Sequence, residues 1–333
     1  MHGVWGGRGG GAAQAVLAAG KAARANAEAA GNAVGIMVAA ARAHVQLDLG
    51  RLPLDGPPGE EMSDAWPRGA PKLVHQTGKR DPLGCSSTKE DLEDSRWCNY
   101  ELVFFARSWE KRNRDFQRRF YDDEDALAFV RDRAPEYLAA YQALWKPVLQ
   151  ADFFRYIVVL KEGGLYSDVD VACTRAFSAY FRPTDRLVVG IERLMPSFEA
   201  AHFSAPGAKG PRALQFLQWT FGAPEPGHPA LRDLCDTIKQ WVLTDVPPGG
   251  GRGPGPRYSA YAAEHGDDMA IMEFTGPGVW TDAVLRHIQH GAEGIRLLPR
   301  EAWGQAPWEE NSLGQPYVLH HFKGSWRSEG PDA

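Results

Sequence analysis

The sequence predicts an α/β fold with a mainly parallel central sheet. Short apolar segments with strand-like patterns alternate along the chain with longer segments that have helical periodicity. The chain has 333 residues, of which 44% are hydrophobic, enough for the core of one large α/β domain or two small ones. Acidic residues follow the central strand-like segment, at the sheet edge where α/β proteins bind ligands.

The first 68 residues differ in composition from the rest of the chain. Residues 6–11 are rich in glycine, residues 12–45 in alanine, and residues 52–67 in proline and glycine. Such biased stretches are typical of accessory arms and linkers rather than of packed domains. We therefore predict an N-terminal arm and linker over 1–68 and one catalytic domain over 69–330.

The first half of this domain should contain two strands and two helices. The expected elements are a strand at 72–76, a helix around 100–106, a strand at 116–121 and a helix from about residue 124. Asp122 and Asp123 would cap that second helix, because carboxylates favour a helix N-terminus. Pro135 should interrupt it.

The central helix and strand are the clearest elements of the sequence. Pro147 suits a first helical turn, and Gly163-Gly164 provides a stop, so we predict a helix between them. The expected elements that follow are strands at 165–171, 186–192 and 317–321, with a Gly/Pro loop at 247–256.

Composition excludes several classes of protein. A net charge of −5 and a pI of about 6.1 do not give the basic surface of a nucleic-acid-binding protein. No run of about 18–20 apolar residues predicts a membrane span. The best apolar run, residues 33–41, ends at Arg42, and charged residues interrupt any signal-peptide pattern.

The four cysteines do not form a zinc-binding pattern, because none belongs to a C-x-x-C pair. Cys85 and Cys98 flank one polar loop and could be bridged in an oxidising compartment. The alternative is that all four cysteines are free thiols.

Asp168 and Asp170 are the strongest candidates for a metal site. Side chains at i and i+2 of a strand share a face, so the two carboxylates converge if the strand continues or meet at its end. Adjacent carboxylates repel each other unless a cation lies between them, and oxygen ligands suit Mg²⁺ or Mn²⁺. Such a triplet is more often a solvated acidic turn, but here it ends an apolar core strand.

Asp152 and Arg155 form a second candidate pair on the preceding helix. They are three residues apart and share a helix face among apolar neighbours. A charged pair in such surroundings costs free energy unless its groups are satisfied. The pair either anchors the helix or reaches hydroxyl groups of a ligand.

Several motifs in this order resemble the family of glycosyltransferases with a DXD motif. The family includes fungal initiating α-1,6-mannosyltransferases, inositol-phosphorylceramide mannosyltransferases and bacterial capsular-sugar transferases. The motifs span about residues 70–327 and are 71–77 (PKLVHQT), 120–123 (FYDD), 146–171, 190–192 (GIE), 218–220 (QWT), 227–229 (GHP), 275–283 (TGPGVWTDA) and 320–326 (HHFKGSW). The blocks from 190 to 283 are most similar to the α-1,6-mannosyltransferase branch.

The resemblance implies a GT-A, Rossmann-like fold and a retaining transfer of mannose from GDP-mannose to a glycan acceptor like an N-glycan outer chain. It implies Mn²⁺, or Mg²⁺, as cofactor and a place in the Golgi lumen, although no anchor is visible. A front-face displacement would need no protein nucleophile. The cation would act on the diphosphate leaving group as Lewis acid and template.

The resemblance also assigns roles to particular residues. Asp170, Asp168 and His321 would hold the metal, whereas His320 should point to the opposite strand face. Taken alone, His321 would more often be a satisfied core histidine. The expected catalytic residues are Asp168, Asp170, Arg155 and Asp152. The expected donor-binding residues are His75, Gln76, Thr77, Asp152, Arg155, Gly164, Tyr166, Asp168, Ser325 and Trp326.

Other features leave the substrate open. Relatives often carry Trp where this chain has Gly78, which puts the preference for the base in doubt. Four more carboxylates could contact an acceptor, although each is more readily a surface charge: Glu192, Asp267, Asp268 and Glu273. A related transferase using a UDP-sugar on a glycolipid or capsular glycan remains an alternative, as does an inactive nucleotide-sugar-binding protein. A metal-dependent hydrolase would need a clustered, water-activating base, and the sequence contains no such motif.

Overall fold

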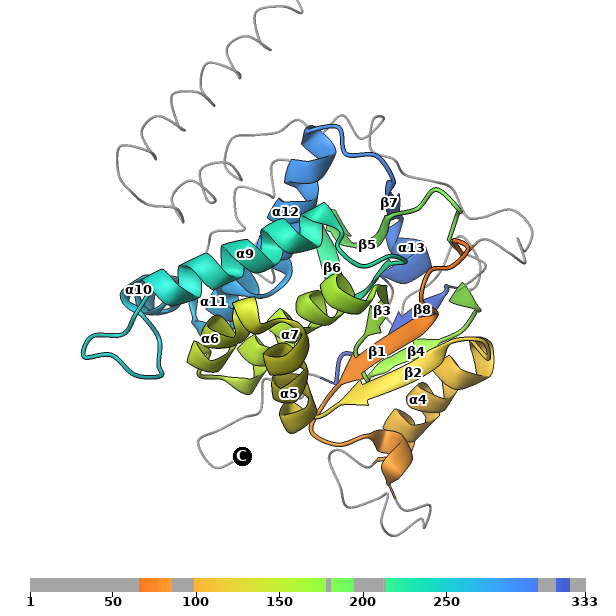
Figure 1. Ribbon diagram of the computed structural model, residues 1–333, viewed down its shortest axis with the longest axis horizontal. Helices are drawn as coiled ribbons and strands as arrows, with labels where there is room; N and C mark the ends of the chain where they lie inside the picture. Colours follow the sequence, from red (N-terminus) through yellow and green to blue (C-terminus); the bar gives the residue numbers. More distant parts are fainter. Residues whose placement is uncertain are drawn as a thin grey trace, which may run out of the picture. The chain divides into compact units, whose positions relative to one another are not determined.

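The computed structural model describes residues 66–85, 99–177, 181–194, 212, 214–304 and 316–323. The predicted arm over 1–68 therefore lies almost wholly outside the described residues. The described part contains a six-stranded sheet with the strand order β2-β1-β3-β6-β5-β7 (Figure 1). Its strands are β1 (Leu73–Thr77), β2 (Gln117–Tyr121), β3 (Gly164–Ser167), β5 (Leu187–Leu194), β6 (Leu214–Ala223) and β7 (Ile295–Leu298).

The sheet is mainly parallel, as predicted. Strand β1 pairs in parallel with β2 and β3, and β5 pairs in parallel with β7. Strand β6 is antiparallel to both β3 and β5. The other five strands therefore run in one direction, and their carboxyl ends lie at one edge of the sheet, where α/β folds bind ligands.

Helices pack on both faces of this sheet (Figure 1). Helices α7 and α12 contact the central strands, α4 contacts β2 and β4, and α13 contacts β5. The helices are α4 (Tyr100–Arg112), α5 (Asp123–Arg133), α6 (Pro135–Ala143), α7 (Pro147–Glu162), α9 (Pro229–Thr244), α10 (Pro256–His265), α11 (Asp267–Phe274), α12 (Pro277–Gln289) and α13 (Arg300–Trp303), with a 3-10 turn, η2 (Pro82–Gly84).

The caps predicted from sequence are present at α5 and α7. The Asp122 side chain accepts hydrogen bonds from two backbone N–H groups of the first turn of α5, and Pro135 starts a new helix. Helix α7 begins at Pro147 and ends at Gly163, which has a φ of 68°. A Cβ atom at Gly163 would lie 2.7 Å from a backbone oxygen, so only glycine fits this turn.

The predicted strand at 165–171 is wrong as a single element. The central strand β3 ends at Ser167, and the chain turns through residues 168–170. It continues as β4 (Val171–Cys173), which pairs with β8 (Val318–His320) in a separate two-stranded sheet. The two aspartates therefore lie in the turn between two sheets, at the end of a strand rather than along it.

Strand β6 carries a large bulge opposite β5. Val189 pairs with Phe221, but Ile191 pairs with Phe216, so β6 has extra residues across this interval. Bulges bend a strand and redirect side chains, and they are common beside active sites. This one lies between residues 216 and 221, level with the end of β3, where Ser167 pairs with Thr220.

Helix α7 provides much of the core. Ten of its sixteen residues are buried, including Phe153, Phe154 and Ile157, which are fully buried. Burying such side chains stabilises the fold by about 1.5–3 kcal/mol each. The carboxylate and guanidinium on this helix are therefore held in a rigid, apolar frame.

No helix in the described part of the chain is long and apolar enough to cross a membrane. Cys173 and Cys235 are free and buried, and Cys85 is part of a disulfide. Cys98, its expected partner, lies outside the described residues.

Candidate metal and donor site

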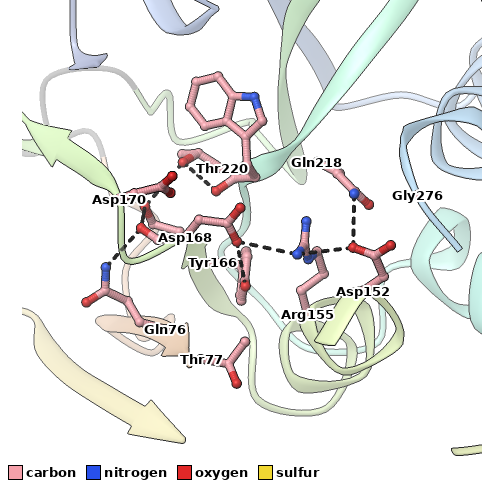
Figure 2. Close-up of polar contacts among 12 residues, drawn as sticks. Gln76, Thr77, Asp152, Arg155, Tyr166, Asp168, Asp170, Gln218, Thr220 and Gly276 are labelled. Atoms are coloured by element: carbon pink, nitrogen blue, oxygen red, sulfur yellow. Dashed lines mark hydrogen bonds and ion pairs between the residues drawn. The ribbon is translucent and has the colours of Figure 1, made fainter. Parts of the chain in front are cut away.

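Asp168, Asp170 and His320 come together at the carboxyl end of the central strands. One potential ligand atom from each residue lies within 4.8 Å of the others. The aspartates come from the turn after β3, and His320 comes from the end of β8, which pairs with β4 next to that turn. Figure 2 shows Asp170, Asp168, Arg155 and Asp152 in one row of charged groups.

Asp170 and His320 contact each other directly. Nε2 of His320 lies 3.2 Å from Oδ1 of Asp170, and Oδ2 accepts a hydrogen bond of 3.0 Å from the Lys323 backbone N–H. Burial works to raise the pKa of Asp170, but His320 and the hydrogen bonds outweigh it and hold that pKa below its usual range. Burial works to lower the pKa of His320, but Asp170 and Asp168 raise it above its usual value.

Asp168 is fixed by its neighbours on the sheet and on α7. Oδ1 accepts a hydrogen bond of 2.7 Å from the Tyr166 hydroxyl and lies 3.4 Å from Nη2 of Arg155. Its backbone N–H donates to the Trp219 carbonyl at 2.8 Å. Burial raises the pKa of Asp168, and Asp170 raises it further, against the effect of Arg155. A cation would relieve the repulsion between the two carboxylates.

Asp152 and Arg155 form a buried network behind this cluster. Nη2 of Arg155 lies 3.1 Å from Oδ1 of Asp152 and bridges it to Asp168. Asp152 also accepts hydrogen bonds from Gln218 at 3.0 Å and from the Thr275 hydroxyl at 2.9 Å. Burial raises the pKa of Asp152 to about 6, although Arg155 and these hydrogen bonds oppose the shift.

Asp152 and Arg155 differ in how fully protein groups satisfy their hydrogen-bonding capacity. Asp152 is 2% exposed, and both of its oxygens are engaged by protein groups. Arg155 is 7% exposed and lies over the Tyr166 ring, and its Nε atom has no hydrogen-bond partner among the described residues. Sequence reasoning left anchoring and ligand binding open, and the structure supports anchoring for Asp152.

The bulge in β6 connects the network with the cluster. Gln218 points to Asp152 (Figure 2). It also accepts a hydrogen bond from the Tyr156 hydroxyl. The next residue, Trp219, lies against His320 with ring centroids 4.5 Å apart. The sequence analysis assigned no role to the side chains of the motif at 218–220. Their contacts depend on the bulge, and a bulge has no simple sequence signature.

His75, Gln76 and Thr77 lie on β1, and their side chains contact protein groups. The His75 ring is fully buried between the Tyr121 hydroxyl and the Gly163 carbonyl, and burial lowers its pKa to about 4. Thr77 donates to the Tyr121 carbonyl at 2.8 Å. Only Gln76 reaches the cluster, because its amide donates to the Asp168 carbonyl at 3.3 Å. Their donor-binding roles stay predictions.

Gly164 and Gly78 have clear packing surroundings. Gly164 has a φ of 87°, and a Cβ atom there would lie 2.7 Å from the Leu73 carbonyl oxygen. A Cβ atom at Gly78 would lie 3.4 Å from the Phe120 ring and 3.7 Å from Val169, which is ordinary contact. Gly164 is therefore required by packing, whereas Gly78 leaves space beside Phe120.

The orientation expected for the two histidines at the end of β8 is corrected by the structure. His320, and not His321, turns its side chain to the two carboxylates. The His321 ring packs on Phe105 with centroids 4.0 Å apart, and only its backbone N–H contacts Asp170. His320 pairs with Val171, which fixes the direction of its side chain. Ser325 and Trp326 lie outside the described residues.

Comparison with known families agrees with this geometry. Residues 100–187 match the family described as the glycosyltransferase sugar-binding region containing a DXD motif. This segment includes α7, β3 and the aspartate turn. Over this segment the chain is similar to the DXD-containing glycosyltransferases.

Curated relatives extend the match beyond that segment. The initiation-specific alpha-1,6-mannosyltransferase of Schizosaccharomyces pombe is 30% identical over 292 residues, which is 78% of this chain and 64% of the relative. The enzyme of the same name from Candida albicans is 28% identical, over 68% of this chain and 67% of the relative. The chain thus spans about two thirds of the length of these two relatives.

Two solved glycosyltransferase structures have a low structural similarity to this chain. PaToxG glycosyltransferase is 14% identical with a TM-score of 0.36, over 83% of this chain and 81% of that one. Mouse xyloside xylosyltransferase 1 is 12% identical with a TM-score of 0.38, over 76% and 98% of the two chains.

Proposed function

We propose that this chain is a retaining, metal-dependent glycosyltransferase that transfers mannose from GDP-mannose to a glycan acceptor. The observation that carries the proposal is the cluster of Asp168, Asp170 and His320 at the ligand-binding edge of the sheet. The two mannosyltransferase relatives support mannose as the transferred sugar. The retaining outcome and the GDP moiety come from the family resemblance.

The residues present fit a divalent cation. Two carboxylates and one imidazole supply oxygen and nitrogen donors within 4.8 Å, a set that suits Mn²⁺ or Mg²⁺. In addition, Nδ1 of His320 is buried without a hydrogen-bond partner among the described residues. We propose that Asp170, Asp168 and His320 hold the ion, with His320 in place of His321. When bound, the ion would neutralise charge on the diphosphate leaving group.

The chain's own residues would orient the donor and supply further positive charge. Arg155 is fixed between Asp152 and Asp168. Its guanidinium is therefore preorganised in a site that excludes most water. Charge held in this way stabilises a developing anion more than it would in bulk water. Tyr166 fixes one oxygen of Asp168 and leaves the other available to a ligand.

A secretory compartment is the proposed location. The disulfide at Cys85 supports an oxidising environment, because such bonds are rare in the cytosol. The Golgi lumen, implied by the resemblance, is one such compartment.

Donor hydrolysis by purified protein tests the proposed function without knowledge of the acceptor. The assay would supply Mn²⁺ and a panel of GDP-sugars and UDP-sugars, and it would compare the wild type with Asp170→Asn. We expect release of GDP from GDP-mannose that needs the ion and is lost in the variant. Asp132→Asn, an exposed carboxylate paired with Arg131, is the matched control.

The other outcomes of this assay are informative. Release of UDP from a UDP-sugar, without release of GDP from GDP-mannose, would support the metal-dependent reaction but show that the donor is a UDP-sugar. Absence of release from every donor, together with absence of donor binding by calorimetry, would contradict the proposal and favour an inactive protein.

A further inference from the structure

Glu192 is a carboxylate near the carboxyl end of β5, at the same sheet edge as the metal cluster. Its Oε1 accepts a hydrogen bond of 3.2 Å from Nε1 of Trp219, and the Trp219 ring packs on His320. His320 in turn contacts Asp170. Two side-chain contacts therefore connect Glu192 to His320, a proposed metal ligand.

The Glu192 carboxylate accepts hydrogen bonds from neutral groups, and Arg193 lies within electrostatic range of it. Its Oε2 accepts a hydrogen bond of 2.5 Å from Nε2 of Gln215, and no Lys, Arg or His among the described residues forms an ion pair with it. Glu192 is also partly exposed. A carboxylate has about four lone-pair sites, so about two of them remain open to a ligand.

Gln215 adds an independent observation. It is 3% exposed, yet its Oε1 atom has no hydrogen-bond partner among the described residues. The amide cannot be reversed, because its oxygen would then face the Glu192 carboxylate. Buried polar atoms without hydrogen-bond partners are rare in native proteins, and a bound group that supplies the missing hydrogen bond would account for one.

The other carboxylates considered from the sequence differ from Glu192. Glu273 is buried and receives two hydrogen bonds from Arg212, at 2.7 and 2.9 Å. Asp267 pairs with Lys146 and accepts a hydrogen bond from Tyr258. Of these three, Glu192 is the one that forms no ion pair among the described residues and lies close to the metal cluster.

We propose that Glu192 and Gln215 bind hydroxyl groups of a sugar, with Trp219 holding the carboxylate in place. The proposal rests on the proposed function, and it assigns the residues that recognise the carbohydrate. A sugar hydroxyl donates to one acceptor, so adjacent hydroxyls of one ring match the open lone pairs of Glu192 and Oε1 of Gln215. The sugar is either that of the donor or that of the acceptor.

Glu192→Gln tests the assignment, because it removes the charge and keeps the shape. The control is Glu225→Gln, a carboxylate beyond the opposite end of β6 that pairs with Arg186. Calorimetry with GDP and Mn²⁺ measures the nucleotide site alone. We expect that affinity to stay within about twofold, and transfer to methyl α-mannoside to fall about 10- to 100-fold, since hydrogen bonds to charged groups are lost.

Donor hydrolysis identifies the source of the sugar. If Glu192 binds the donor sugar, hydrolysis of GDP-mannose falls with transfer, and its affinity weakens while that of GDP does not. If Glu192 binds the acceptor, hydrolysis is unchanged and the KM for methyl α-mannoside rises. Unchanged transfer in Glu192→Gln would overturn the proposal, and so would a joint loss of GDP affinity and thermal stability.

A separate experiment keeps this inference distinct from the proposed function. If the wild type binds no nucleotide diphosphate with Mn²⁺, the proposed function has failed. Saturation-transfer NMR with methyl α-mannoside then examines the sugar site alone. A signal that is lost in Glu192→Gln and kept in Glu225→Gln supports the assignment, whereas equal signals in all three proteins exclude it.

Discussion

Two neighbouring groups of charged residues differ in how fully the protein satisfies them. Asp152, on α7, is 2% exposed, and Arg155, Gln218 and Thr275 engage its two oxygens. Asp170, in the turn after β3, receives one imidazole and one backbone N–H. Asp170 also repels Asp168, whose pKa it raises.

This difference separates structural from ligand-binding polar groups. A buried carboxylate with complete partners stabilises one arrangement of the chain, and its loss is felt in folding. Two adjacent carboxylates repel each other, and a cation bound between them lowers their free energy. Nε of Arg155 and Nδ1 of His320 are buried and have no hydrogen-bond partner among the described residues. We therefore count both residues as ligand-binding groups.

Asp152→Ala should have the largest effect and should act on stability. The substitution leaves Arg155 buried with one carboxylate fewer, and breaking a buried pair costs about 3–5 kcal/mol. Urea unfolding of the variant measures this loss, with Asp132→Ala as an exposed control that should change little. A stable Asp152→Asn protein that has lost donor binding would break the comparison, because it would make Asp152 a ligand-binding residue.

Asp170→Asn should act on turnover and leave folding intact. Loss of this ligand would loosen the cation that stabilises negative charge on the leaving group, and loss of such electrostatic stabilisation typically lowers the rate about 100- to 1,000-fold. The measurement is kcat for donor hydrolysis under saturating Mn²⁺, with the thermal unfolding midpoint of the same sample as control. A variant that unfolds as readily as Asp152→Ala would show that both carboxylates are structural.

His75 should affect stability, as Asp152 does, because protein groups contact both of its ring nitrogens. Burial lowers its pKa to about 4, while the unfolded value is 6.5, so the unfolded chain takes up the proton first as the pH falls. The contribution of His75 to the free energy of unfolding is fully present above pH 6.5. It is lost as the pH falls towards 4, by about 3 kcal/mol in total.

Urea unfolding at pH 7.5 and pH 4.5 measures this loss for the wild type and His75→Gln. The variant should lose less free energy of unfolding than the wild type between the two pH values. His290→Gln, at an exposed position, should follow the wild type. An identical pH dependence of His75→Gln and the wild type would argue against a buried neutral imidazole.

The sequence predicted the elements that local rules determine. Pro147, the glycines at 163–164 and Asp122 fixed the ends of α5 and α7, because each acts on its own helix terminus. The triplet at 168–170 was placed at a ligand-binding edge for the same reason, since apolar residues precede it. The sequence did not predict that β3 ends before the triplet, because β4 pairs with β8, which is nearly 150 residues away in the chain.

Long-range register also explains why the partners of Asp152 were missed. Gln218 reaches it from β6, and Thr275 reaches it from the turn between α11 and α12. The contact with Gln218 needs the bulge between residues 216 and 221. No local pattern distinguishes a bulged strand from a regular one. Side-chain alternation gives two opposite faces, but which face meets the cluster depends on the pairing of a distant strand.

The adjacent histidines provide the most direct test of that register. His320 contacts Asp170 through Nε2, whereas the His321 ring lies on Phe105. His320→Ala should weaken Mn²⁺ binding at least about tenfold, because loss of even an outer-shell contact has an effect of that size. His321→Ala should change it less than about twofold, since the stack on Phe105 does not include a proposed ligand.

Titration of each variant with Mn²⁺, followed by the paramagnetic resonance of the free ion, gives both affinities directly. Because the two substitutions remove the same group from neighbouring positions, they serve as controls for each other. The opposite order, with His321→Ala the weaker binder, would mean that β8 shifts by one residue when the ion binds. That result would place His320 among the satisfied groups and restore the assignment made from the sequence.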